Sequence, residues 1–115
     1  MIKFIPADAG SISHGTLNSE DLCKAFGQAL DELANTNRAF LAEKENSIFA
    51  EMVKNGLRDW RKCYDWNGDF INNDTTAEVV SEDLPCILDR FAPENHIFGA
   101  HQGDGSDFGF WPAFE

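Results

Sequence analysis

Apolar residues recur every three or four positions in three stretches of the chain, which is the spacing of one buried face of an α-helix. The first stretch follows Asn18 and Ser19, either of which can cap a helix, and Glu20 and Asp21 suit its first turn. The polar Asn-Thr-Asn run at 35–37 ends it. Its apolar face comprises Leu22, Phe26, Ala29, Leu30 and Leu33.

The second and third stretches, at 39–62 and 75–92, predict two further helices. In the second, Gly56 is the weak point, since Gly costs about 1 kcal/mol relative to Ala inside a helix. In the third, Pro85 is tolerated only near a first turn, so we place the ordered start near Ser81 and the end before Pro93. The apolar positions are Phe40, Leu41, Ile48, Phe49, Met52, Val53, Leu57 and Trp60 in the second stretch and Val80, Leu84, Ile87, Leu88 and Phe91 in the third.

Alternating apolar and polar residues predict strands at both ends of the chain. Ile2 and Phe4 flank Lys3, which indicates a short N-terminal strand, whereas the small polar residues at 10–15 indicate a loop. From His96 to Phe114, two apolar runs flank a six-residue loop, Gln102–Asp107, as in a β-hairpin.

Glycines and a proline give further detail to this hairpin. Gly103 and Gly105 can supply positive φ in its loop. Gly99 and Gly109 lie inside the strands, where Gly marks a bulge or a close backbone approach. Pro112 belongs on an edge or at the end of the ladder because it has no N–H to donate.

The order strand, helix, helix, helix, hairpin predicts the α+β class. We expect about three helices packed on a small antiparallel sheet that includes the C-terminal β-hairpin. A chain of 115 residues fits one compact acidic domain. Residues 2–5 are expected to add a third strand, since a hairpin alone is marginally stable.

The net charge is -11, and nearly all of it falls in the second half of the chain. Residues 1–62 carry eight bases and nine acids, whereas residues 63–115 carry one base, Arg90, and eleven acids. This distribution argues against nucleic acid as a direct partner, because phosphate contacts need Lys and Arg. It favours a basic, nucleic-acid-binding protein as partner. An acidic face that serves only solubility is the alternative.

Other features predict a cytoplasmic protein without a membrane anchor. No apolar run approaches the roughly 20 residues of a membrane span, and the N-terminus lacks the apolar core of a signal peptide. Cys23, Cys63 and Cys86 are odd in number and widely spaced, so we interpret them as reduced thiols.

No motif predicts catalysis, a metal or a cofactor. Asp65–Asp69 resembles the start of a calcium loop, but Phe70 and Thr76 replace the Gly and Glu that the loop requires, so we expect a plain Asx turn. A Cys–His nucleophile pair lacks any flanking signature.

The histidines of the tail are candidate metal ligands. His96 and His101, with Asp104 and Asp107, would point to opposite faces of an ideal strand and would converge only with a bulge at Gly99. We therefore predict no metal site among them. An enzyme using His101 with Asp104 or Asp107 is the weakest of the functional alternatives.

Two motifs resemble a group of small acidic accessory proteins carried by phages and plasmids. The first is Gly15-Thr16-Leu17 followed by Glu20-Asp21-Leu22; the second is the closing run from Phe98 to Pro112. The polar segment Asp65–Asp74 has no counterpart in the resemblance. The resemblance implies a mobile genetic element, where small acidic proteins often inhibit host defence, and it implies no catalytic residue.

These observations lead to two functional hypotheses. The first is a non-enzymatic anti-CRISPR or anti-restriction inhibitor that binds a nucleic-acid-handling effector through an acidic, DNA-mimicking surface. The second is a structural or adaptor module that docks through the aromatic C-terminal hairpin. The oligomeric state is left open. The predicted partner-binding residues are Asp65, Asp69, Asp74, Glu78, Glu82, Asp83, Asp104 and Asp107, with Trp66 and Trp111 as aromatic anchors.

Overall fold

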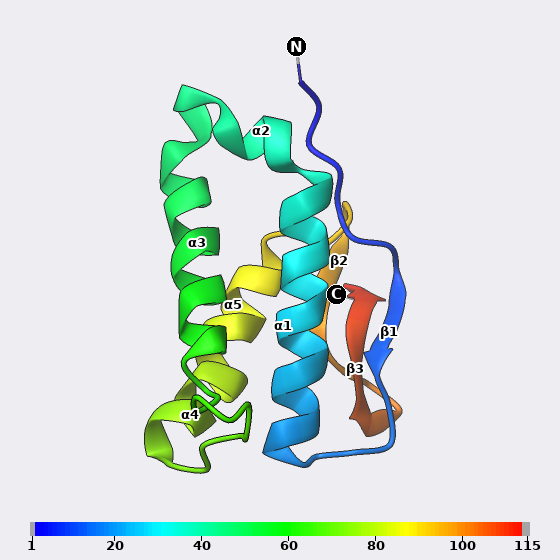
Figure 1. Cartoon of the computed structure of the whole chain (residues 1–115). Helices are drawn as coiled ribbons and strands as arrows, with labels where there is room; N and C mark the ends of the chain where they lie inside the picture. The colour runs from blue at the N-terminus through cyan, green and yellow to red at the C-terminus, as the bar shows by residue number, and fades with distance from the viewer. Residues whose placement is uncertain (1, 114–115) are drawn as a thin grey trace.

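A layer of helices covers one face of a small antiparallel sheet (Figure 1), as the predicted α+β class requires. The computed structural model describes residues 2–113, so Phe114 at the end of the predicted hairpin stretch lies outside the described residues. Helices α1 (Ser19–Thr36) and α3 (Ser47–Arg61) stand side by side in opposite directions. The segments α4 (Asp74–Glu78), η2 (Val79–Asp83) and α5 (Leu84–Asp89) form one further helical run. Among the described residues, no helix is both long and apolar enough to cross a membrane.

The sheet has three strands in the order β1-β3-β2, and both pairings are antiparallel. They are β1 (Gly10–Ser13), β2 (His96–His101) and β3 (Asp104–Pro112), which places β3 in the centre. The predicted close approach at Gly109 is confirmed, because a Cβ there would overlap the carbonyl oxygen of Gly10. The close approach predicted at Gly99 is wrong, because a Cβ there would meet nothing within 4 Å.

The N-terminal strand is not where the alternation of Ile2 and Phe4 placed it. Residues 2–9 are extended but unpaired with the sheet, and the third strand is the segment predicted as a loop. The cause is a side chain at the end of α1. Asn37, only 2% exposed, accepts from the backbone N–H of Ile5 at 2.7 Å and donates to its carbonyl at 2.8 Å. These bonds take the groups that a ladder would have used.

The single helix predicted for residues 39–62 is broken into α2 (Arg38–Ala42), a 3-10 turn η1 (Lys44–Asn46) and α3. Glu43 between them is extended, with φ -69° and ψ 137°. The corner allows Phe40 and Phe49 to pack on Phe4 from different elements, with ring centroids 5.2 and 6.1 Å from that ring. Aromatic packing at the corner thus outweighs the helical periodicity.

The third helix begins earlier than predicted and ends earlier too. A capping box between Asn73 and Thr76 starts it at Asp74, and it runs on past Pro85 to Asp89. Proline has no N–H for the usual helical bond and crowds the turn before it. Here the turn before Pro85 is the π-helical η2, a wider turn that accommodates the ring.

The hairpin turn is much shorter than the six-residue loop predicted at Gln102–Asp107. Only residues 102–103 form the turn, and neither Gly103 nor Gly105 takes a positive φ. The pairing jumps from Ala100↔Phe108 to His101↔Asp104, so residues 105–107 of β3 bulge out without partners on β2. A bulge re-aims side chains near the end of a sheet, and here it carries Asp107, with Asp104 just before it.

Gly27 allows α1 and α3 to approach closely, and its replacement by alanine is expected to destabilise the fold. A Cβ there would overlap the Trp60 ring, which cannot flex away, whereas at Gly56 it would meet the mobile tip of Ile87. We expect Gly27→Ala to lower the free energy of unfolding by about 1–3 kcal/mol, despite the better helix propensity of Ala. Urea unfolding should show a smaller loss for the matched variant Gly56→Ala. A more stable Gly27→Ala would contradict this packing.

Candidate functional site

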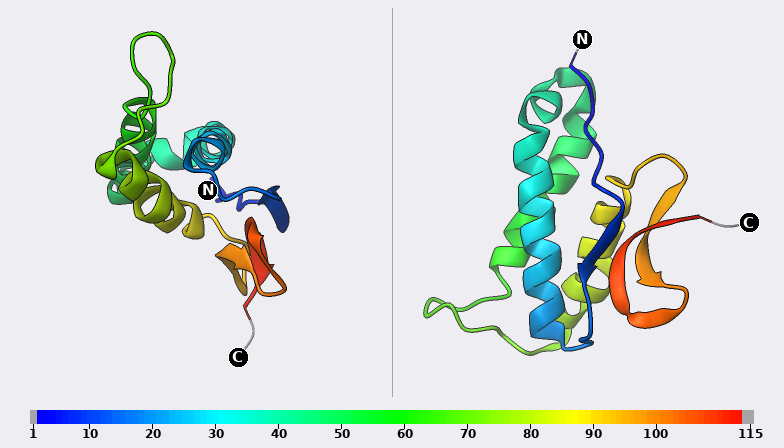
Figure 2. Two further views of the ribbon diagram at one scale, coloured as in Figure 1. Left: turned by 90° about the horizontal axis from the view of Figure 1, so that it is seen from below. Right: turned by 90° about the vertical axis from the view of Figure 1, so that its right-hand side faces the viewer.

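The predicted acidic residues gather at one end of the molecule, the lower end in Figure 1, but in two separate groups. We call Asp65, Asp69, Asp74, Glu78, Glu82 and Asp83 the loop–helix group. Asp104 and Asp107 are the hairpin group. Figure 2 shows that the loop at 62–73 and the hairpin extend to opposite sides of the helices. One continuous acidic surface through all eight residues is therefore not what the fold presents.

The loop within the loop–helix group is an ordered Asx turn, as predicted. The Asp65 carboxylate accepts from the backbone N–H of Asn67 at 2.9 Å and of Asp69 at 3.0 Å. Tyr64 and Phe70 pair across its base, and Gly68 has φ +87°. A local bond network therefore holds the tip in one conformation.

Trp66 lies at the tip of this turn with 93% of its surface exposed. This exposure is unusual, because a Trp side chain is ordinarily highly buried in a folded protein. The carboxylates of Asp65 and Asp69 flank it in sequence, and both residues are exposed. The turn thus carries one exposed apolar ring and two exposed acidic residues.

On the adjoining helical run, Asp74, Glu78 and Glu82 are exposed and follow one another every four residues. Asp83 instead turns toward α3 and lines a cleft with Asp59 and Lys62. The end of α3 also carries Arg58 and Arg61. These bases flank the loop–helix group, so its net charge is smaller than a count over residues 63–115 suggests.

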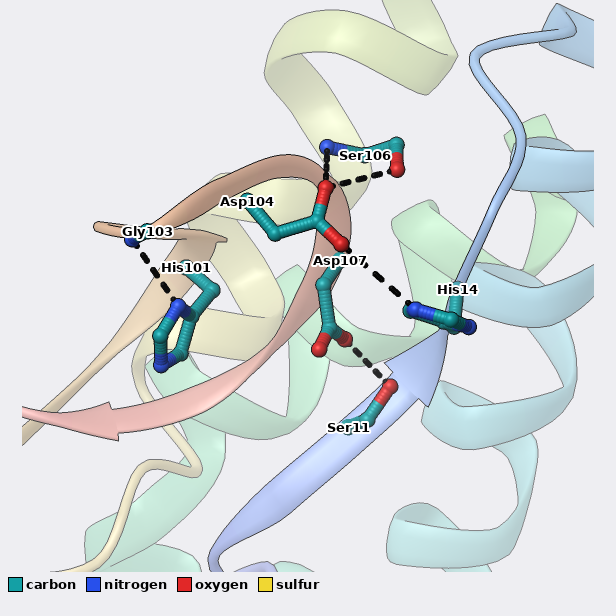
Figure 3. A network of polar contacts seen from close by, with 7 residues as sticks. All are labelled: Ser11, His14, His101, Gly103, Asp104, Ser106 and Asp107. Carbon is teal, nitrogen blue, oxygen red and sulfur yellow. Dashed lines mark hydrogen bonds and ion pairs between the residues drawn. The ribbon is translucent and has the colours of Figure 1, made fainter.

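The hairpin group gains a histidine that the sequence did not single out. His14, which follows β1, places its Nε2 3.5 Å from Asp104 Oδ2 (Figure 3). Asp107 completes the cluster and accepts a hydrogen bond from the Ser11 hydroxyl. The backbone N–H and hydroxyl of Ser106, with smaller contributions from nearby histidines, hold the pKa of the Asp104 carboxyl below its usual value. Sequence patterns do not reveal His14, because it lies about ninety residues away in the chain and within a segment predicted as a loop.

His96 and His101 do not meet, because they occupy the first and last positions of β2. The Nδ1 of His96 is 2.8 Å from the carbonyl oxygen of Glu94, and the Nδ1 of His101 accepts from the Gly103 N–H. The irregularity in β2 lies between Ala100 and His101 rather than at Gly99. A shared site for these two rings is therefore excluded by their separation along the strand.

Most aromatic residues of the hairpin face the core. Phe98 and Phe110 are 8% and 1% exposed. Trp111 is half-buried; its Nε1 donates to the Gly99 carbonyl at 3.1 Å, and its ring meets the edge of His101. With Ile97 it lines a shallow hollow of about 570 Å³ on the outer face. The accessible apolar surface of the hairpin is therefore this outer face, and not its phenylalanine side chains.

Two of the three cysteines are buried and unreactive in character. Burial raises the pKa of the Cys63 thiol to about 12 and also raises the pKa of Cys23. At neutral pH both are protonated, so neither supplies the thiolate that nucleophilic catalysis needs. Cys86 is exposed.

Comparison with known proteins finds no family model, curated protein or solved structure that matches this chain. Support for a function therefore comes from the loop–helix group itself and from the sequence resemblance.

Proposed function

We propose that this protein is a non-enzymatic, phage- or plasmid-encoded inhibitor of a bacterial defence system, of the anti-CRISPR or anti-restriction kind. It binds a nucleic-acid-handling effector through the loop–helix group and so occupies a basic surface meant for nucleic acid. The observation that carries the proposal is Trp66, 93% exposed in an ordered turn that also carries the exposed residues Asp65 and Asp69.

A basic nucleic-acid channel matches this turn chemically. Arginine side chains that hold phosphates also pair with carboxylates and lie flat on an indole ring. Tryptophan is among the residues that most often dominate a protein interface, with truncation costs of about 2 kcal/mol or more. Because the Asx turn is ordered beforehand, little conformational entropy is lost when Trp66 is buried by a partner.

The helical acids add negative charge beside the Asx turn. Residues four apart in a helix rise by about 6 Å. Asp74 and Glu78 of α4, with Glu82 of the π-helical η2, thus form a row of exposed acidic residues, and Lys and Arg placed for phosphates can pair with them.

The test is capture of purified CRISPR and restriction effectors by the immobilised protein at about 50 and about 500 mM salt, conditions that differ strongly in charge screening. The proposal predicts capture of one effector at low salt, weakened at high salt and lost with Trp66→Ala. Trp111→Ala is the matched control and should retain capture. No capture at either salt would refute the proposal.

The adaptor function is the second candidate, favoured by the outer face of the hairpin. Ile97 is 50% exposed and pairs in register with Trp111, and β2 forms an edge of the sheet. This mode predicts capture that is insensitive to salt and sensitive to Ile97→Ser. Deleting residues 108–115 would not distinguish the inhibitor from the adaptor function. The deletion removes most of the central strand β3 and would disturb the fold itself.

A further inference from the structure

Three side chains of the kinds that ligate metals meet where β1 ends and β3 begins. Ligand atoms of His14, Asp104 and Asp107 all lie within 4.8 Å of one another (Figure 3). They come from two distant parts of the chain; Asp104 pairs with His101 at the start of β3, and Asp107 lies in the bulge at residues 105–107. None of the three belongs to the loop–helix group, so a role for this cluster is independent of the proposed function.

The spacing fits a tetrahedral ion. Zinc bonds to histidine nitrogen and carboxylate oxygen at about 2.0–2.2 Å, which places neighbouring ligands of a tetrahedron about 3.4 Å apart. His14 Nε2 and Asp104 Oδ2 are 3.5 Å apart. Ligand atoms of the third residue, Asp107, lie within 4.8 Å of both, and the His14 and Asp104 side chains are substantially exposed, 68% and 45%.

The two carboxylates of the cluster have a histidine beside them but, among the described residues, no permanently charged base. Among residues 2–113, the ion pairs are His14 with Asp104 and Arg58 with Asp59, so no Lys or Arg neutralises Asp104 or Asp107. Two carboxylates this close repel each other unless a cation lies between them. The serines at 106 and 11 bond to one oxygen of each carboxylate, which orients these groups as outer-shell partners orient metal ligands.

We propose that His14, Asp104 and Asp107 bind one Zn²⁺ ion, with a fourth position open to water. The imidazole distinguishes this set from calcium and magnesium sites, which are built from oxygen ligands. A bound ion would tie the segment after β1 to the central strand β3. It would also neutralise the hairpin group and leave the charge of the loop–helix group unchanged.

The experiment is a Zn²⁺ titration by isothermal calorimetry in a Cys86→Ser background, which removes the exposed thiol as a competing ligand. We expect one ion per chain. Loss of a ligand in His14→Ala or Asp104→Asn should weaken binding by about tenfold or more, since even outer-shell partners contribute that much. His96→Ala and His101→Ala are matched histidine controls and should bind as the parent does.

Two further readouts separate this site from chance binding. Zn²⁺ should raise the thermal midpoint of the parent but not of His14→Ala, because the ion binds only the folded state. Co²⁺ in place of Zn²⁺ should give the d–d absorption of a nitrogen and oxygen site without a thiolate band. Equal affinity in parent, His14→Ala and Asp104→Asn, or no binding, would overturn the proposal. Preference for Ca²⁺ would overturn the choice of metal.

Discussion

Replacing Phe26 with alanine is expected to lower the free energy of unfolding by about 3–5 kcal/mol, the usual cost of removing a buried aromatic ring. Phe26 lies on α1 and is 1% exposed. Its ring meets the edges of Phe98 and Phe108, with centroids 5.2 and 5.5 Å away. One side chain thus joins the helical layer to both strands of the hairpin. Because small domains are stable by only about 5–15 kcal/mol, this loss is a large fraction of the total free energy of unfolding.

Urea unfolding followed by circular dichroism measures this loss. Ile48→Ala is the control, because that residue is also a large apolar side chain in a helix but is 87% exposed. Its effect should stay within about 0.5 kcal/mol. A loss below about 1 kcal/mol for Phe26→Ala would contradict the packing between helices and sheet.

Reversing three charges of the loop–helix group should slow binding to the effector. In the combined variant Asp74→Lys, Glu78→Lys and Glu82→Lys, we expect an association rate about 10- to 1000-fold lower at low salt, because electrostatic steering acts mainly on encounter. The three residues are exposed, so the fold should survive. Stopped-flow or surface-based kinetics across a range of ionic strength measures the rate.

The control for this variant changes the net charge equally at the other end of the molecule. Glu32, Glu45 and Glu51 are exposed and belong to the end of α1, η1 and the start of α3. Their combined replacement by lysine should slow association far less. Equal slowing in both variants would show that total charge, rather than the loop–helix group, drives encounter.

Local patterns predicted the elements that depend on local interactions. The apolar spacing and the Asn18 cap located α1 correctly, since Asn18 accepts hydrogen bonds from the backbone N–H groups of Glu20 and Asp21. The hairpin was also predicted from its apolar runs. These elements follow from contacts within a few residues of sequence.

Distant contacts decided the elements that were predicted wrongly. Residues 2–5 alternate like a strand, yet their backbone bonds to Asn37, thirty-two residues away. The segment Gly10–Ser13 has no strand pattern, but the close approach that Gly109 permits makes it β1. A local sequence pattern does not indicate which distant residue will form a hydrogen bond with a segment, or which distant glycine will allow another strand to approach.

In the candidate site, too, features that depend on local interactions were predictable and features that depend on distant contacts were not. The Asx turn at Asp65 was predictable, because its bonds span only four residues. Trp66 and Trp111 were both predicted as aromatic anchors; Trp66 is exposed as expected, whereas Trp111 is half-buried because its ring packs on His101 and its Nε1 bonds to Gly99. The meeting of His14 with Asp104 required the hairpin register, in which a two-residue turn and a bulge replace the expected loop.

The most direct test of the central claim is displacement of labelled nucleic acid from the effector that the protein captures. If the loop–helix group occupies the nucleic-acid channel, added protein should release the labelled strand in proportion to its own binding. The Trp66→Ala and charge-reversed variants should release it only at much higher concentration. A complex in which effector, nucleic acid and this protein are bound together, with no loss of nucleic-acid affinity, would contradict the account.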